Sequence, residues 1–138
     1  MDKVLLDTDI LSEIFKAKNA TVVANAVAYK EAFGQFTLSV ITVMEIVKGL
    51  HKINRADALQ KFLVGLQTCE VLLFDQACAE IAGRIFADLE QIGHPIGRAD
   101  PMIAAIALHN NLMLVTGNAI HYQQIQKLGY PLKLNNWR

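Results

Sequence analysis

The amino-acid sequence predicts an α/β fold of three layers, with a parallel sheet between two layers of helices. Short unbroken apolar runs alternate with helical patterns along the chain, which is the order of strands joined by crossover helices. The runs over 4–6, 71–74 and 112–115 show no polar face, as expected for strands covered on both sides. The 138 residues are 53% hydrophobic and 19% charged, a globular composition that fits one domain over residues 1–138.

The first half of the chain is expected to hold two strands and four helices. Residues 4–6 form the first strand, and Asp7-Thr8-Asp9 offers caps for a helix over residues 10–16. Thr42 starts another helix, because apolar residues follow it at the spacing i, i+3, i+4 and i+7. The remaining elements are an Ala- and Val-rich helix over 20–33 ended by Gly34, a strand over 36–40 and a helix over 55–66.

The second half continues the alternation. Residues 71–74 form a strand, and Asp75 caps a long helix whose core stripe is expected to be Cys78, Ile81, Ala82, Ile85 and Leu89. Asp100-Pro101 opens an almost wholly apolar helix over 102–108, whose alanines suit close packing on the sheet. The other elements are a loop over 93–97, a strand over 112–115, a helix over 118–128 closed by Gly129 and a short edge strand over 132–134.

Charge and cysteine content exclude several classes of protein. The chain has 13 basic and 13 acidic residues, so any affinity for RNA must come from local patches. Cys69 and Cys78 form neither a disulfide framework nor a CxxC pattern, and they are typical of reduced thiols in a cytoplasmic chain. There is no signal-peptide pattern, and no apolar stretch approaches the ~20 residues that span a bilayer. All 13 acids lie at or before Asp100, so later residues supply no carboxylate side chain to a site.

Three acids stand out, although each has an ordinary structural explanation. Asp7 follows a strand at a turn into a helix, where Asp is a favoured cap. Glu45 stands three residues after Thr42 and fits a capping box. Asp100 before a proline is a common start of a helix. Taken singly, these structural roles are the better explanation of each acid.

Their joint placement favours a function. Ligands of parallel α/β sheets bind beyond the carboxyl ends of the strands, where Asp7, Glu45 and Asp100 are all expected. Like charges about 4 Å apart repel by roughly 4 kcal/mol at an effective dielectric of about 20, so a cluster needs a counter-charge. Hard oxygen ligands select Mg²⁺ or Mn²⁺, and such an ion activates water and stabilises charge on a phosphoryl oxygen. No protein nucleophile is then required.

The chain resembles the PIN-domain ribonucleases of the VapC toxin type over almost its whole length. Four stretches in order carry the resemblance, together with Asn136-Trp137: residues 4–11, 39–45, 96–105 and 114–118. The resemblance implies a PIN-like parallel sheet of about five strands and Mg²⁺ or Mn²⁺ held by Asp7, Glu45 and Asp100. It also implies endonucleolytic cleavage of RNA, an antitoxin partner that blocks the site, and a homodimer.

The sequence departs from this family at two positions. The family often has Asn where Asp9 stands, which adds a carboxylate here. The family also often has a fourth acid after the last core strand, where this chain has Asn118 and His121. Asn118 is able to hydrogen-bond a metal-bound water but carries no charge. The sequence therefore predicts one well-held metal, with a second one weak or brought in with the RNA.

Further polar residues are expected around the three acids. Thr8, Asp9, Thr116 and Asn118 are expected to support the site, and Lys48 and Arg98 are candidates for contacts with RNA phosphates. A solvated helix face explains Lys48 at least as well. The lone histidines at 94, 109 and 121 are not expected to act in catalysis.

Two other functions stay open at this point. Asp7-x-Asp9 after an apolar strand also resembles the nucleophile motif of haloacid-dehalogenase-type phosphatases, which form a covalent aspartyl intermediate. That class needs an acid pair after a late strand, and residues 112–115 are followed by none. The other alternative is a non-catalytic PIN-like module that only binds a partner. Metal-dependent RNA cleavage distinguishes the enzyme from this module.

Overall fold

A computed structural model describes residues 1–97 and 99–138, and within them five short strands all run parallel. Two of them form one ladder, β2 (Thr37–Ser39) with β3 (Glu70–Leu72). The other three form a sheet in the order β1 (Val4–Leu6), β4 (Met113–Val115) and β5 (Leu134–Asn135). The expected parallel arrangement of about five strands is confirmed.

A tyrosine side chain separates the two sheets. Strands β1 and β2 are neighbours but share no backbone ladder. Tyr29 comes from helix α2 (Ala20–Phe33) and is fully buried, with its hydroxyl 3.4 Å from the Val4 amide and 3.2 Å from the Val4 carbonyl. The same hydroxyl lies 3.0 Å from Thr37 Oγ1 on β2. The hydroxyl thus satisfies backbone groups that a ladder between β1 and β2 would otherwise join.

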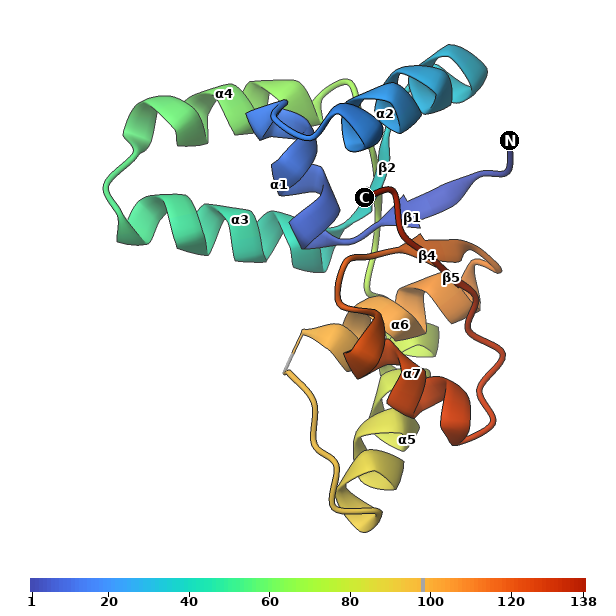
Figure 1. Cartoon of the computed structure of the whole chain (residues 1–138). Helices are drawn as coiled ribbons and strands as arrows, with labels where there is room; N and C mark the ends of the chain where they lie inside the picture. Colours follow the sequence, from blue (N-terminus) through green and yellow to red (C-terminus); the bar gives the residue numbers. More distant parts are fainter. Residues whose placement is uncertain (98) are drawn as a thin grey trace.

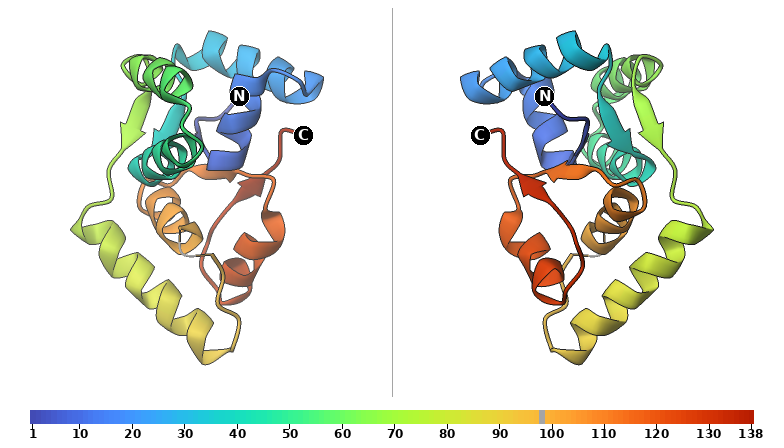
Figure 2. Two further views of the ribbon diagram at one scale, coloured as in Figure 1. Left: turned by 90° about the vertical axis from the view of Figure 1, so that its left-hand side faces the viewer. Right: turned by 90° about the vertical axis from the view of Figure 1, so that its right-hand side faces the viewer.

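Helices lie on both sides of the strands, as predicted (Figure 1, Figure 2). One side holds α1 (Thr8–Lys16), α2, α3 (Val40–Lys52) and α4 (Ala56–Leu66). The other side holds α5 (Gln76–Gln91), α6 (Asp100–His109) and α7 (Ala119–Lys127). Strand β1 alternates between two cores, because Val4 and Leu6 pack with α1 and α2 whereas Leu5 packs with α5 to α7.

Helix α6 is the most deeply buried helix of the molecule. Five consecutive residues from Ile103 to Ala107 have no exposed surface. Three of these are alanines, and their small side chains allow α6 to pack against both the sheet and α5. Four residues of the predicted α5 core stripe are buried, namely Cys78, Ala82, Ile85 and Leu89, and the fifth, Ile81, is partly buried against the same core. No helix in the described ranges is both long and apolar enough to cross a membrane.

Neither Glu45 nor Asp100 has the capping role that the sequence suggests, although α6 does begin at Asp100 as predicted. Helix α3 begins at Val40 because Ser39 is its N-cap, with Ser39 Oγ accepting from the Thr42 amide at 3.1 Å. The predicted capping box of Thr42 and Glu45 therefore does not form. Asp100 is the first residue of α6 and makes no capping hydrogen bond. The carboxylates of Glu45 and Asp100 are thus not used as helix caps.

Candidate active site

Asp7 is the buried centre of the candidate site. It follows β1, is 3% exposed, and its Oδ1 accepts from the Thr8 amide while its Oδ2 accepts from Thr116 Oγ1, both at 2.8 Å. Burial raises the pKa of Asp7, with smaller contributions from the charges of Asp9 and Asp100, and the two hydrogen bonds lower it, so that the pKa is about 6. A cation beside this carboxylate would relieve both effects.

A relay of hydroxyl groups joins the Asp7 turn to Glu45. Thr8 Oγ1 donates to Glu45 Oε1 at 2.6 Å and lies 2.9 Å from Thr42 Oγ1. A threonine hydroxyl has one proton, so Thr42 donates to Thr8, and Thr42 accepts in turn from Ser39 at 3.4 Å. The relay explains why Thr42 is completely buried although it is polar. It fixes the start of α3 against the start of α1.

Asp100 is held by two residues of α7. Its Oδ1 accepts from the Tyr122 hydroxyl at 3.3 Å, and its Oδ2 lies 3.1 Å from His121 Nδ1. An ionised carboxylate only accepts, so the His121 nitrogen is the donor. Burial raises the pKa of Tyr122, and the charges of Asp7 and Asp100 raise it further. The Tyr122 hydroxyl therefore stays protonated between the two carboxylates.

The structure thus brings the three predicted acids to one edge of the fold. Thr8 links Asp7 to Glu45, and Tyr122 donates to Asp100 while the charges of both Asp7 and Asp100 raise its pKa. The donor oxygens of the three acids are not all within 4.8 Å of one another. The three acids would therefore not all contact one ion directly in this arrangement, and Mg²⁺ is able to reach carboxylates through the waters that it keeps.

Asp9 is engaged elsewhere. Its Oδ1 accepts from the Ile10 amide and its Oδ2 from the Gly117 amide, both at 2.8 Å. Arg138 Nη2 lies 3.6 Å from the same Oδ2, and Arg138 Nε bonds Glu13 Oε1 at 2.8 Å. Burial raises the pKa of Asp9 despite these partners. The extra carboxylate therefore anchors the loop after β4 rather than facing the other three acids.

The loop after β4 uses its backbone as much as its side chains. Thr116 Oγ1 donates to Asp7 and accepts from the Asn118 amide at 2.9 Å. The Asn118 side chain is exposed and does not cap α7. Thr116 is therefore a direct partner of Asp7, whereas Asn118 contributes its backbone N–H.

Of the two residues predicted to contact RNA phosphates, Lys48 and Arg98, the structure describes only Lys48. Lys48 is exposed on α3, one turn after Glu45, and has no ion pair among the described residues. Arg98 lies outside the described residues. His121 is the reverse case, because it was expected to be an ordinary surface histidine and instead contacts Asp100.

Tyr122, Ser39 and Arg138 were not predicted from the sequence. Tyr122 carries a usable signal, since it is a polar aromatic residue on the buried stripe of α7 with Ile125. Ser39 also carries one, because a serine at the end of a strand is a good N-cap. The contact of Arg138 with Asp9 spans the whole chain, so no local pattern reveals it.

Comparison with known proteins matches residues 4–127 to the PIN domain family. The chain is 32% identical over 130 residues to the tRNA(fMet)-specific endonuclease VapC of Shigella flexneri, covering 91% of this chain and 93% of that protein. It is 26% identical over 130 residues to ribonuclease VapC1 of Methanocaldococcus jannaschii, covering 94% and 86% of the two chains.

Two solved structures are similar to the chain over nearly its whole length. A chain of the DNA-bound VapBC complex from Salmonella typhimurium matches with a TM-score of 0.80 and 27% identity, over 100% of both chains. A chain of the VapBC2 complex from Rickettsia felis, bound to a DNA fragment from its promoter, matches with a TM-score of 0.79 and 27% identity, over 99% and 100% of the two chains.

Proposed function

The chain belongs to the PIN-domain family, and from this premise we propose that it is a divalent-metal-dependent endoribonuclease, the toxin of a toxin–antitoxin pair. The observation that carries the proposal is the buried Asp7 carboxylate, which is linked through Thr8 to Glu45 and whose charge, like that of Asp100, raises the pKa of the Tyr122 hydroxyl. The names of the similar proteins support the same activity, since they are called ribonucleases or endonucleases.

The donor set fits Mg²⁺ or Mn²⁺, with Asp7, Glu45 and Asp100 as the ligands. All three offer carboxylate oxygens, and the pKa of Asp7 is raised by burial first and by the nearby charges of Asp9 and Asp100 second, effects that a divalent ion would oppose. When bound, the ion supplies a water of lowered pKa and stabilises charge on the phosphate that is attacked. The protein's part is to hold the carboxylates in place before RNA arrives.

The surrounding residues position these carboxylates. Thr8 and Thr116 fix both oxygens of Asp7, and His121 and Tyr122 fix both oxygens of Asp100. Such partners of ligands set their orientation and commonly change metal affinity about 10–100-fold when removed. Lys48 is exposed near Glu45 and is proposed to contact an RNA phosphate.

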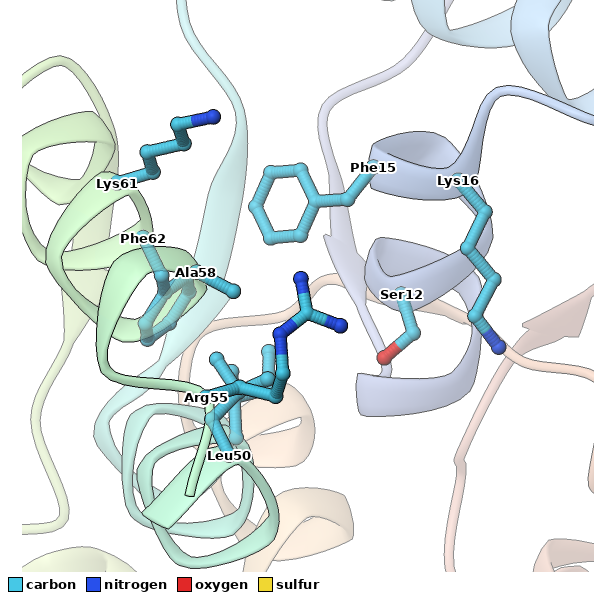
Figure 3. A pocket seen from close by; sticks show the side chains of 9 residues that line it. Ser12, Phe15, Lys16, Leu50, Arg55, Ala58, Lys61 and Phe62 are labelled. Atoms are coloured by element: carbon cyan, nitrogen blue, oxygen red, sulfur yellow. The ribbon is translucent and has the colours of Figure 1, made fainter. Parts of the chain in front are cut away.

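The antitoxin is proposed to bind a groove between α1, α3 and α4 (Figure 3). The cavity there has a volume of about 490 Å³. Phe15 is 55% exposed on its wall and packs edge-on against Phe62, with ring centroids 5.8 Å apart. Three cations border the same groove: Lys16, Arg55 and Lys61. An apolar floor with a basic rim suits a helix that has an apolar face and acidic flanks.

Helix α4 lines this groove, whereas α2 does not. The similar solved chains come from VapBC complexes, which supports a protein partner for this chain as well.

The decisive experiment is RNA cleavage by the purified chain without its antitoxin. Structured RNAs are incubated with Mg²⁺ or Mn²⁺, and the new RNA ends are mapped. We expect cleavage by the wild type, and its loss with a chelator and in Asp7→Asn and Asp100→Asn. Glu80→Gln changes an exposed acid on α5 and should cleave normally. Identical traces for all proteins would favour the non-catalytic module, and turnover of small phosphate esters instead would favour the phosphatase.

A further inference from the structure

A second group of metal-binding side chains lies away from the acidic site. The donor atoms of Asp75, Cys78 and His109 are all within 4.8 Å of one another, and no other trio of His, Cys, Asp or Glu in the described residues comes so close. Asp75 Oδ2 is 3.8 Å from His109 Nε2. The three residues come from two helices, because Asp75 caps α5, Cys78 lies in its first turn and His109 ends α6.

Each of these side chains keeps a free donor atom. Asp75 uses Oδ1 as the N-cap, accepting from the Cys78 amide at 3.0 Å, so its Oδ2 is left facing His109. The Cys78 thiol is fully buried, and its weak hydrogen bonds go to the Leu73 carbonyl at 3.8 Å and to the Asp75 carboxylate. Capping therefore explains one oxygen of Asp75 but not the gathering of the other two groups.

The electrostatics of the two helix ends largely offset one another. The N-terminus of α5 disfavours a cation, whereas the C-terminus of α6, where His109 lies, favours one. The carboxylate of Asp75 and the thiolate of Cys78 would add two negative charges. These charges decide the balance in favour of a divalent cation.

The trio is separate from the candidate active site. His109 is the last residue of α6 and Asp100 is its first. A helix of ten residues is about 15 Å long, so the two groups lie at opposite ends of α6.

We propose that Asp75, Cys78 and His109 form a second metal site, which takes Zn²⁺ or a similar transition ion and not Mg²⁺. One thiolate, one imidazole and one carboxylate are the ligands that Zn²⁺ accepts, whereas Mg²⁺ requires oxygen ligands. Solvent completes the fourth position. The site joins the start of α5 to the end of α6, so the bound ion stabilises this packed pair of helices.

The test is Co²⁺ titration of the full-length protein with its thiols reduced. Absorption from a sulfur–cobalt bond is expected in the wild type, rising to one equivalent and displaced by Zn²⁺. Cys78→Ala should abolish it, and His109→Gln should weaken binding at least about tenfold. Cys69→Ala and His94→Gln are matched controls, since they alter the other cysteine and an exposed histidine. Both should keep the signal.

Two further measurements separate this proposal from the proposed RNase activity and from loss of folding. Asp7→Asn should keep the sulfur–cobalt signal, because the acidic site contains no thiol, so failure of the RNase proposal would leave this result untouched. Zn²⁺ should raise the melting temperature of the wild type but not of His109→Gln, whose changed side chain is exposed. The proposal is overturned if reduced wild type shows no sulfur–cobalt absorption, or if the absorption survives in Cys78→Ala and disappears in Cys69→Ala.

Discussion

Asp7 is the residue at which function and stability oppose each other. Its folded pKa, about 6, lies above its ordinary value of 3.8, so the folded protein binds this proton more tightly than the unfolded chain does. Its contribution to folding is therefore unfavourable above pH 6, and the penalty is relieved as the pH falls through 6 towards 3.8. At about 1.4 kcal/mol per pKa unit, the penalty is about 3 kcal/mol.

Replacing this carboxylate should stabilise the metal-free protein. Asp7→Asn keeps the shape of the side chain and removes its charge, so we expect a gain of up to about 3 kcal/mol at pH 7.5 together with loss of RNA cleavage. The measurement is urea unfolding in the presence of a chelator, repeated between pH 4.5 and 7.5. Wild-type stability relative to Asp7→Asn should rise as the pH falls. A variant less stable than wild type at pH 7.5 would contradict the burial argument.

Tyr122 tests whether the hydroxyl between the acids positions them. Tyr122→Phe removes the donor to Asp100, so cleavage should require at least about tenfold more Mg²⁺, while stability changes by about 1 kcal/mol. The measurement is the cleavage rate as a function of Mg²⁺ concentration. Tyr130→Phe is the matched control, because the Tyr130 hydroxyl bonds Asp88 on α5 at 2.6 Å, away from the site. Equal Mg²⁺ dependence of the two variants would remove Tyr122 from the site.

At the scale of the elements, the turn after β4 requires a glycine at position 117, because there is no room for a side chain. A Cβ at Gly117 would lie 2.6 Å from Asp9 Oδ2 and would overlap the Arg138 guanidinium. The glycine therefore allows Asp9, Arg138 and the Gly117 amide to meet, and this junction holds the loop that carries Thr116 to Asp7.

Gly117→Ala should therefore destabilise the fold by about 1–3 kcal/mol, the usual cost of overpacking. Gly65→Ala is the opposite case, because Gly65 lies inside α4 with open space around it and alanine favours helix by up to about 1 kcal/mol. Chemical denaturation of both variants measures the difference. If both substitutions changed the free energy of unfolding in the same direction, the close packing at Gly117 would not matter for stability.

At the scale of the whole molecule, the proposed antitoxin groove and the candidate active site are lined by different residues. The proposed antitoxin groove has Phe15 on its wall, whereas the candidate site has buried acids at the ends of β1, α3 and α6. Phe15 is 55% exposed, so its removal does little to the core but exposes the floor of the groove.

Phe15→Ala should thus weaken the antitoxin complex while RNA cleavage by the free chain persists. A central aromatic anchor is worth at least about 2 kcal/mol, which is roughly 30-fold in Kd. Calorimetry with the cognate antitoxin measures this. Ile120→Ala serves as control, since Ile120 is 74% exposed on α7, outside the groove. If Phe15→Ala bound the antitoxin as tightly as the wild type does, the antitoxin would have to bind another surface.

The sequence by itself determined the order and direction of the elements and the edge at which Asp7, Glu45 and Asp100 meet. Unbroken apolar strands such as residues 4–6 specify buried parallel strands, and local patterns identify helices within a few residues. Competing local signals misplaced the start of α3, because Ser39 and Thr42 are both good caps and only one of them follows the strand end.

Only the tertiary structure decided which of these side chains act together. Four contacts join residues that are 22 or more apart in the chain: Tyr122 with Asp100, Thr8 with Glu45, Arg138 with Asp9 and His109 with Asp75. Hydrophobic periodicity reports which face of an element is buried, but it carries no information on which polar groups meet across elements. Such meetings follow from packing, which places the partners only after the cores on both sides of β1 have formed.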